Sequence, residues 1–204
     1  MAKMSGPKSD GELLGGVPIL AFSAAGEWER WLDRNHASPS GLWLKIGKTK
    51  SGIASVSYAE ALEAALCYGW IDAQKRGYDE SSWLQKFTPR KARSIWSKVN
   101  RQKAAELIAA GRMKPAGLEA VETAKKNGQW ESAYDSPAAA AVPPDLEAEL
   151  ERRPEAKAFF AALSGTNRYS ILHRLQTAKK PETRAKRLEK FVQMLENRET
   201  IYPQ

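Results

Sequence analysis

The chain has 204 residues, one cysteine and a formal net charge of +8 at pH 7. A single cysteine excludes an intramolecular disulfide framework, and no apolar run reaches the roughly 18–20 residues that a membrane-spanning helix needs. The basic balance favours a polyanionic partner such as nucleic acid, anionic lipid or an acidic protein. Residues 1–16 are polar and glycine-rich, so we expect a disordered leader without a targeting signal, and a cytoplasmic protein.

Residues 17–134 carry the mixture of helix and strand patterns that is typical of an α+β domain. Ser23 is placed to cap a first helix with apolar residues at helical spacing. Residues 42–48 alternate between apolar and polar side chains, which predicts a half-buried strand. The sequence Ser57-Tyr-Ala-Glu60 is a capping box, and the helix that it starts is expected to end at Gly69.

The next segments predict an antiparallel hairpin and two further helices. Residues 70–76 and 82–88 alternate as strands, and residues 77–81 form the turn between them. The period becomes helical from residue 97 to 111 and again from 115 to 128. Because the two hairpin strands are contiguous in the chain, we expect a small antiparallel sheet with flanking helices.

An alanine- and proline-rich stretch at residues 135–144 predicts a linker. Residues 145–200 then form an all-helical segment that we expect to pack on the first domain. Its expected helices cover residues 144–153, 154–163, 168–178 and 181–197. The last begins with Pro181 at its first turn and carries an expected core stripe of Ala185, Leu188, Val192 and Leu195. The predicted fold class is α+β, followed by this C-terminal all-helical segment.

The positive charge is concentrated in two runs. Between Lys86 and Lys114, nine basic residues face one acid, Glu106, so this run alone carries a net charge of +8. A strand ends within it and a helix begins at Ser94 or Ser97, where free amides suit phosphate or carboxylate. Two interpretations stay open: an anion pocket in which Trp96 stacks on a ring, or a solvated basic face with Trp96 in the core. The second run covers residues 179–190.

A second candidate region joins a helix end to a strand start at residues 67–72. There Asp72 either pairs with an arginine of residues 88–93, in a cleft or as a structural salt bridge, or forms an acid/base pair with Asp79. The candidate ligand-binding residues are Trp70, Asp72, Arg90, Lys91, Arg93, Ser94, Trp96 and Asn100. The two histidines, His36 and His173, lie far apart in the sequence, and no nucleotide-binding or nucleophile motif is present. We therefore expect no metal and no cofactor.

Several short motifs occur in a fixed order along residues 20–198: CYGWID at 67–72, FTPRK at 87–91, SIWSKVN at 94–100, GRMKPAG at 111–117 and AKKPETRAKR at 178–187. In this order and spacing they resemble the YdeI/OmpD-associated family. The resemblance implies a bacterial protein with a role in bacteriocin protection. Part of the family's name comes from association with an outer-membrane porin. The resemblance carries over no catalytic residue.

Three classes of function remain open. A nucleic-acid-binding protein would show a steep salt dependence, because phosphate contacts release counterions. A protein-interaction module in stress or bacteriocin tolerance would bind its partner with only a weak salt dependence. An enzyme on a small anionic substrate would hold Asp72, Arg90 and Trp96 together in one concave pocket. We favour binding over catalysis, with a basic anion-binding surface around residues 88–101.

Overall fold

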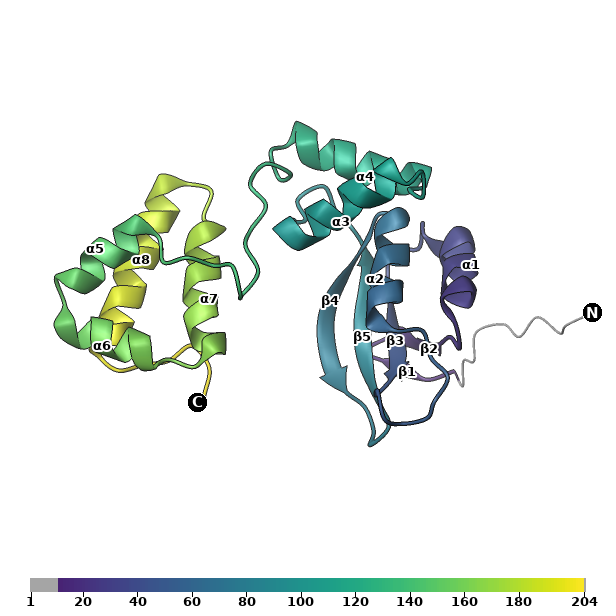
Figure 1. Ribbon diagram of the computed structural model, residues 1–204, viewed down its shortest axis with the longest axis horizontal. Helices are drawn as coiled ribbons and strands as arrows, with labels where there is room; N and C mark the ends of the chain where they lie inside the picture. Colours follow the sequence, from purple (N-terminus) through teal and green to yellow (C-terminus); the bar gives the residue numbers. More distant parts are fainter. Residues whose placement is uncertain (1–10, 204) are drawn as a thin grey trace, which may run out of the picture. The chain divides into compact units, whose positions relative to one another are not determined.

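The structure, a computed structural model, describes residues 11–203. Its contacts divide the chain into two compact units (Figure 1). The N-terminal unit comprises Met1–Ile95 and Asn100–Glu131, and the C-terminal unit comprises Trp96–Val99 and Ser132–Gln204. Each unit is described by itself below. The expected packing of the helical segment on the first domain stays a prediction.

Five strands form the sheet of the N-terminal unit: β1 Leu13–Leu14, β2 Val17–Ala21, β3 Leu42–Gly47, β4 Trp70–Gly77 and β5 Ser82–Pro89. Their order in the sheet is β1-β2-β3-β5-β4. β2 and β3 are parallel, because a helix carries the chain back between them, and the other neighbouring pairs are antiparallel. The expected α+β class is confirmed, and the sheet is mixed through this one parallel pair.

β1 lies inside the range that the sequence assigns to a disordered leader. Leu13 and Leu14 pair with Pro18 and Val17 across a two-residue turn, so the chain is already part of the sheet at residue 13. Residues 1–10 of the expected leader lie outside the described residues. The expectation of disorder is therefore corrected for residues 13–14, where hairpin pairing supplies the order.

Four helices belong wholly or largely to the N-terminal unit: α1 Ala25–Asn35, α2 Tyr58–Cys67, α3 Lys98–Ala109 and α4 Pro115–Lys126. The capping box of Ser57 and Glu60 is present at the start of α2. Ser23 does not cap α1, since Ala24 occupies the N-cap position and the Ser23 amide and hydroxyl both donate to Glu27.

The main core of this unit lies between the sheet and helices α1 and α2, which cover one face of it (Figure 1). The largest fully buried side chains there come from both layers and include Trp28, Leu32, Leu42, Leu44, Trp70 and Phe87. Leu42 and Leu44 alternate with Trp43, which joins Ile19 and Leu84 in a second apolar cluster. The alternation in β3 thus places apolar side chains on both faces of the sheet.

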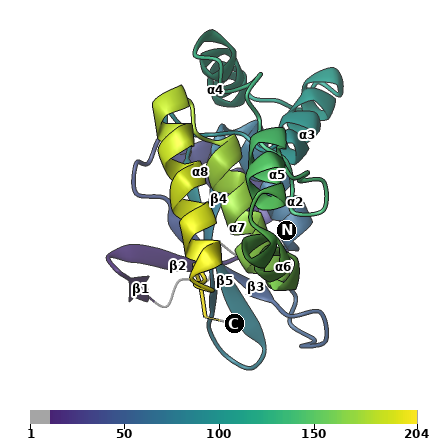
Figure 2. The same ribbon diagram turned by 90° about the vertical axis from the view of Figure 1, so that its left-hand side faces the viewer.

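The C-terminal unit is a group of four short helices: α5 Pro144–Glu151, α6 Pro154–Ala162, α7 Gly165–Gln176 and α8 Pro181–Glu196. α8 packs against the other three (Figure 2). Proline occupies the first turn of α5, α6 and α8, where its missing amide costs no helical hydrogen bond. The buried residues of the unit include Leu146, Phe160, Ile171, Leu175, Phe191 and Leu195.

The expected core stripe of α8 is only half correct. Val192 and Leu195 are buried in the core of the C-terminal unit. Leu188 is half-buried and Ala185 is exposed. The first two turns of α8 therefore carry apolar side chains that the packing of the four helices leaves open, and these line a groove that is considered below.

Candidate functional site

The chain leaves β5 through a tight basic turn at residues 91–94. The Ser94 amide donates to the Lys91 carbonyl oxygen at 2.8 Å, and the Lys91 amide donates to the Ser94 Oγ at 2.9 Å. Just before the turn, the Arg90 amide donates to the Gly69 carbonyl oxygen at 2.9 Å. The backbone of the basic turn is thus held by its own hydrogen bonds, and the side chains of Lys91 and Arg93 are exposed.

A side chain from the end of α4 ties down the basic turn. Asn127, the C-cap residue of α4, donates from Nδ2 to the Ala92 carbonyl oxygen. This hydrogen bond brings the last turn of α4, with Lys125 and Lys126, next to Lys91 and Arg93. Two pairs of basic residues that are more than 30 positions apart in the sequence are therefore neighbours in the fold.

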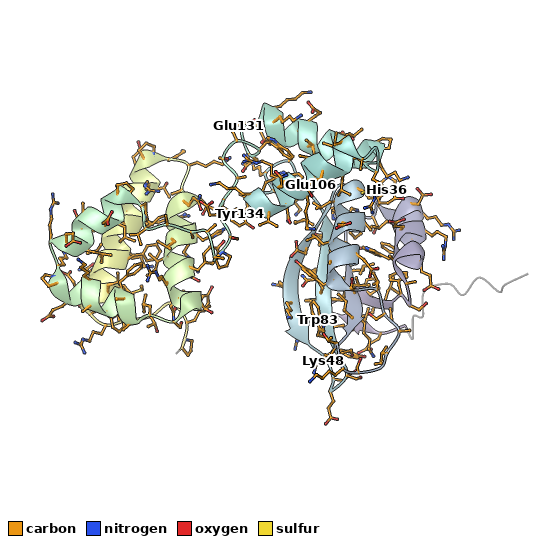
Figure 3. The ribbon with its side chains drawn as sticks, in the orientation of Figure 1. His36, Lys48, Trp83, Glu106, Glu131 and Tyr134 are labelled. Atoms are coloured by element: carbon orange, nitrogen blue, oxygen red, sulfur yellow. The ribbon has the colours of Figure 1, made fainter. Side chains whose placement is uncertain are left out.

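Trp130 lies beside the same group of basic residues. Lys125 Nζ is 5.9 Å from the centre of the Trp130 ring, and Arg101 donates to the Trp130 carbonyl oxygen at 3.1 Å. Two acids accompany them: Glu122, which pairs with Lys125 at 2.8 Å, and the exposed Glu131 (Figure 3). We call this set the basic surface: Lys91, Arg93, Arg101, Lys125, Lys126 and Trp130.

Arg90 has a different role from its two basic neighbours. Its guanidinium donates from Nη1 to the Ile95 carbonyl oxygen at 3.2 Å, across the base of the turn. Ser94 supplies the turn hydrogen bonds described above. Of the predicted site residues in this loop, Lys91 and Arg93 therefore present their charges outward, whereas Arg90 and Ser94 shape the turn.

The two predicted tryptophans are core residues. Trp70 is fully buried and donates from Nε1 to the His36 carbonyl oxygen at 2.8 Å, with its ring edge-on to Trp31. Trp96 is 3% exposed and belongs by its contacts to the C-terminal unit. Asn100, in α3, is also buried. These positions favour the core interpretation of Trp96 over a stacking platform.

Asp72 accepts a hydrogen bond from the Tyr58 hydroxyl at 2.9 Å. Asp79 lies in the turn after β4, where hydrogen bonds from Ser82 and Ser81 hold the pKa of its carboxyl well below the usual range. Both acids thus have local partners in hydroxyl and amide groups. Burial raises the pKa of the Cys67 thiol, which makes it a weak nucleophile at neutral pH.

A cluster that the sequence did not predict lies near Asp72, where a β-bulge interrupts the pairing of β4 with β5. Lys75 Nζ lies 4.4 Å from the centre of the Trp83 ring, and the Tyr58 ring is 6.1 Å from it (Figure 3). Gln85 donates to the Gln74 carbonyl oxygen within the bulge. The bulge is a feature that alternation of apolar residues does not reveal, because it shifts the register by local backbone geometry.

Much of the first basic run is neutralised by acids from other elements. Lys103 and Arg112 pair with Glu63 of α2, at 3.4 Å and 3.2 Å, and Arg112 also lies 3.8 Å from Glu29. Glu106, the one acid inside the run, accepts from Gln102 on the same helix (Figure 3). The run is therefore less positive in space than in the sequence.

The N-terminus of α3 already has partners from its own chain. Lys98, its first residue, donates from its amide to the Tyr134 carbonyl oxygen at 2.8 Å. The Lys98 ammonium lies 2.6 Å from the Asp135 carboxylate, and this hydrogen bond, together with one from Gln176, lowers the pKa of Asp135. The chain itself thus supplies partners for the first amide of α3 and for the Lys98 side chain, and an anion pocket at this helix start stays a prediction.

Two arginines of the second basic run hold the C-terminal unit together. Arg184 makes a two-pronged ion pair with Asp145, with both contacts at 2.7 Å, and donates to the Leu175 carbonyl oxygen at 2.8 Å. Arg187 donates to the Arg174 carbonyl oxygen. Both guanidiniums therefore satisfy open carbonyls at the end of α7. The motif at 178–187 thus has a structural role in joining α5, α7 and α8.

Two further findings concern the residues 11–203. Among them, no group of three or more histidine, cysteine, aspartate or glutamate side chains is placed to hold a metal ion. Within the same range, no helix has both the length and the apolar character that crossing a bilayer requires.

The fold and the site define a two-part protein, a mixed-sheet α+β unit with a basic surface followed by a four-helix unit. Residues 20–120 match a domain of unknown function (DUF8412), and residues 139–198 match the family described as bacteriocin-protection, YdeI or OmpD-associated. The second match confirms the resemblance to the YdeI/OmpD-associated family over residues 139–198. The motif at 178–187 lies in that match, and the four earlier motifs lie in the first. No curated protein and no solved structure matches the chain.

Proposed function

We propose that this protein is a binding protein that takes a polyanionic partner, nucleic acid above all, on the basic surface of its N-terminal unit. The hydrogen bond from Asn127 to the Ala92 carbonyl oxygen carries the proposal, because it joins Lys91 and Arg93 to Lys125 and Lys126. Four cationic side chains from two separate segments then point into solvent from a braced backbone. Such an arrangement suits a chain of phosphates, which are contacted at several points.

The surroundings of these side chains support the same class of partner. Trp130 is half-buried, and the ring of such a residue beside lysines is a common feature of single-stranded nucleic-acid binding. The family description adds bacteriocin protection, and we include in the proposal a role in bacteriocin or stress tolerance in a bacterial cytoplasm. Binding without a catalytic step agrees with the local hydrogen bonds of Asp72 and Asp79 and with the burial of Cys67.

The test is fluorescence anisotropy with labelled single- and double-stranded DNA and RNA, titrated with the full chain over a series of salt concentrations. The key variant is Lys91→Ala/Arg93→Ala, because Arg90 is needed for the shape of the turn. We expect this variant to bind more weakly at every salt concentration. A plot of log affinity against log salt concentration has a negative slope. Its magnitude should decrease by about two units in the variant, one for each lost phosphate contact.

The matched control is Lys179→Ala/Lys180→Ala, which removes the same two charges from exposed positions between α7 and α8. It should leave the salt slope unchanged. If both double variants lose the same affinity for nucleic acid, the effect depends on net charge alone. That result would contradict binding at the basic surface. Absence of binding by the wild type near physiological salt would rule out the nucleic-acid function itself.

A further inference from the structure

The C-terminal unit has a groove of its own, with a volume of about 360 Å³, between the end of α5 and one side of α8. Glu149 and Arg153 form one wall, and the residues of α8 that face them run from Ala185 to Glu196. We call this the α8 groove. Eleven residues of helix separate its ends, so it is about 16 Å long, the length of roughly three helical turns.

The floor of the α8 groove is apolar. Ala185, Leu188 and Val192 line it at positions i, i+3 and i+7 of α8, the spacing of one helical face. Val192 is buried, Leu188 is half-buried and Ala185 is exposed. This is the stripe that the sequence assigns to the core, and its N-terminal half remains open. An apolar helix stripe left open in this way is typical of a docking groove.

The rims of the groove are acidic. Glu149, Glu189 and Glu196 line it together with the cation Arg153, and Arg152 also pairs with Glu149 at 2.9 Å. Arg153 bridges the two walls: it pairs with Glu149 on α5 and, at 3.0 Å, with Glu196 on α8. The chain's own guanidinium thus lies between two rim carboxylates, while Glu189 is exposed to solvent. Two of the three rim carboxylates thus have arginine partners, and Glu189 is the rim carboxylate that is placed to receive a cation of a partner.

We propose that the α8 groove docks a basic amphipathic helix of a partner protein. Small apolar side chains on one face of that helix contact Ala185 and Leu188, and lysine or arginine side chains flanking them reach Glu189 and the neighbouring rim. Floor and rim together favour a cationic amphipathic helix, because a fully polar peptide would lose water at the apolar floor without gaining hydrogen bonds, and an acidic peptide would meet Glu189. This inference is independent of the basic surface on the N-terminal unit.

The experiment uses the full chain and two fluorescein-labelled synthetic helices of about four turns each, one built from leucine, alanine and lysine, the other with glutamate in place of lysine. Anisotropy should show saturable binding of the lysine peptide alone. Glu189→Lys should weaken it about tenfold, since an attractive rim contact becomes repulsive. Gln193→Lys, on the same rim, provides a second variant with the same expected direction.

Glu155→Lys is the matched control, because it makes the same charge change at an exposed position of α6 that does not line the groove. It should change the affinity less than about twofold. Equal binding of the two peptides, or equal weakening by Glu155→Lys and Glu189→Lys, would overturn the proposal. So would a concentration-dependent dimer of the chain, seen by sedimentation velocity and lost in Glu189→Lys, because the occupant would then be a second copy.

Discussion

Gly117 of α4 lies against the backbone carbonyl of Cys67, the last residue of α2, so closely that a Cβ at position 117 would be 2.2 Å from the carbonyl oxygen. The same oxygen accepts a hydrogen bond from the Lys114 amide at 3.0 Å. The two motifs at 67–72 and 111–117 therefore meet at this point. The close packing of these two helix ends explains the glycine at position 117.

Gly117→Ala should destabilise the N-terminal unit, because the added methyl group would meet backbone atoms that cannot move out of its way. Overpacking of this kind costs about 1–3 kcal/mol of unfolding free energy. Urea denaturation followed by tryptophan fluorescence measures it, since most of the tryptophans lie in this unit.

Gly26→Ala is the control for this prediction. Gly26 is also a helical glycine of the N-terminal unit, but a Cβ there would meet only the far end of the Arg30 side chain at 3.4 Å. We expect a neutral or slightly stabilising effect, up to about 1 kcal/mol, because alanine narrows the unfolded ensemble. If both variants unfold at the same urea concentration, the contact between Gly117 and Cys67 does not constrain the fold.

Asn127→Ala should loosen the basic turn without changing any charge. The substitution removes the hydrogen bond to the Ala92 carbonyl oxygen, which joins the end of α4 to the turn. Hydrogen exchange of the amides at residues 91–94 should become faster, and polyanion affinity should fall by a few fold, because the two basic pairs lose their fixed spacing. The far-UV circular dichroism spectrum should not change. If the variant keeps both the wild-type polyanion affinity and the wild-type protection of these amides, Asn127 does not position the basic surface.

The basic surface shows why charge in a sequence is only a partial guide to charge in space. The first basic run contributes Lys91, Arg93 and Arg101 to the surface, while Lys103 and Arg112 pair with Glu63, which lies far away in the sequence. Lys125 and Lys126 come from outside the run. Their position at the end of α4 was readable from the helix pattern, but their distance from Lys91 depends on a tertiary hydrogen bond that no local pattern encodes.

The helices and the β4–β5 hairpin could be predicted because period and capping are local properties, as with the capping box of Ser57. β1 and β2 were missed. Composition placed residues 1–16 in a leader, whereas Gly15 and Gly16 both have positive φ and form the two-residue turn of a hairpin. The Gly15-Gly16 pair, which is typical of a hairpin turn, was a better indicator of structure there than composition. Ala185 and Leu188 failed as core residues because helical period predicts an apolar face, but not which part of that face the neighbouring helices cover.

Arg184→Met should destabilise the C-terminal unit by roughly 1 kcal/mol at neutral pH, a modest value because Arg184 and Asp145 are both partly exposed. The hydrogen bonds from Arg184 lower the pKa of Asp145 in the folded state. The stabilisation is thus fully present above the unfolded pKa of about 3.9 and is lost as pH falls through the lower folded pKa. Urea denaturation at pH 7 and near pH 3 should show the gap between wild type and variant narrowing at acid pH. A constant gap would contradict the role of this ion pair.

His173 gives the C-terminal unit a second, separate dependence on pH. Its ring packs edge-on against Tyr134 at 4.6 Å and lies 5.7 Å from Tyr169. Burial, followed by the nearby charges of Arg174 and Arg187, lowers the pKa of His173 below its usual value. Near pH 6.5 the His173 side chain therefore takes up a proton in the unfolded chain but not in the folded chain. As a result, the stability of the wild type falls as pH drops below about 6.5, until the lower pKa of the folded state is reached.

His173→Phe retains a ring between the two tyrosines and removes the titration. Its unfolding free energy should therefore rise relative to wild type as pH falls from about 7.5 to about 5.5, a window in which carboxylates stay ionised. His36 is present in both proteins, so its contribution cancels in the difference. Urea denaturation followed by far-UV circular dichroism at several pH values gives this difference directly. Parallel curves for the two proteins would mean that His173 binds its proton equally in both states, and that the ring contacts with Tyr134 and Tyr169 do not depend on the neutral imidazole.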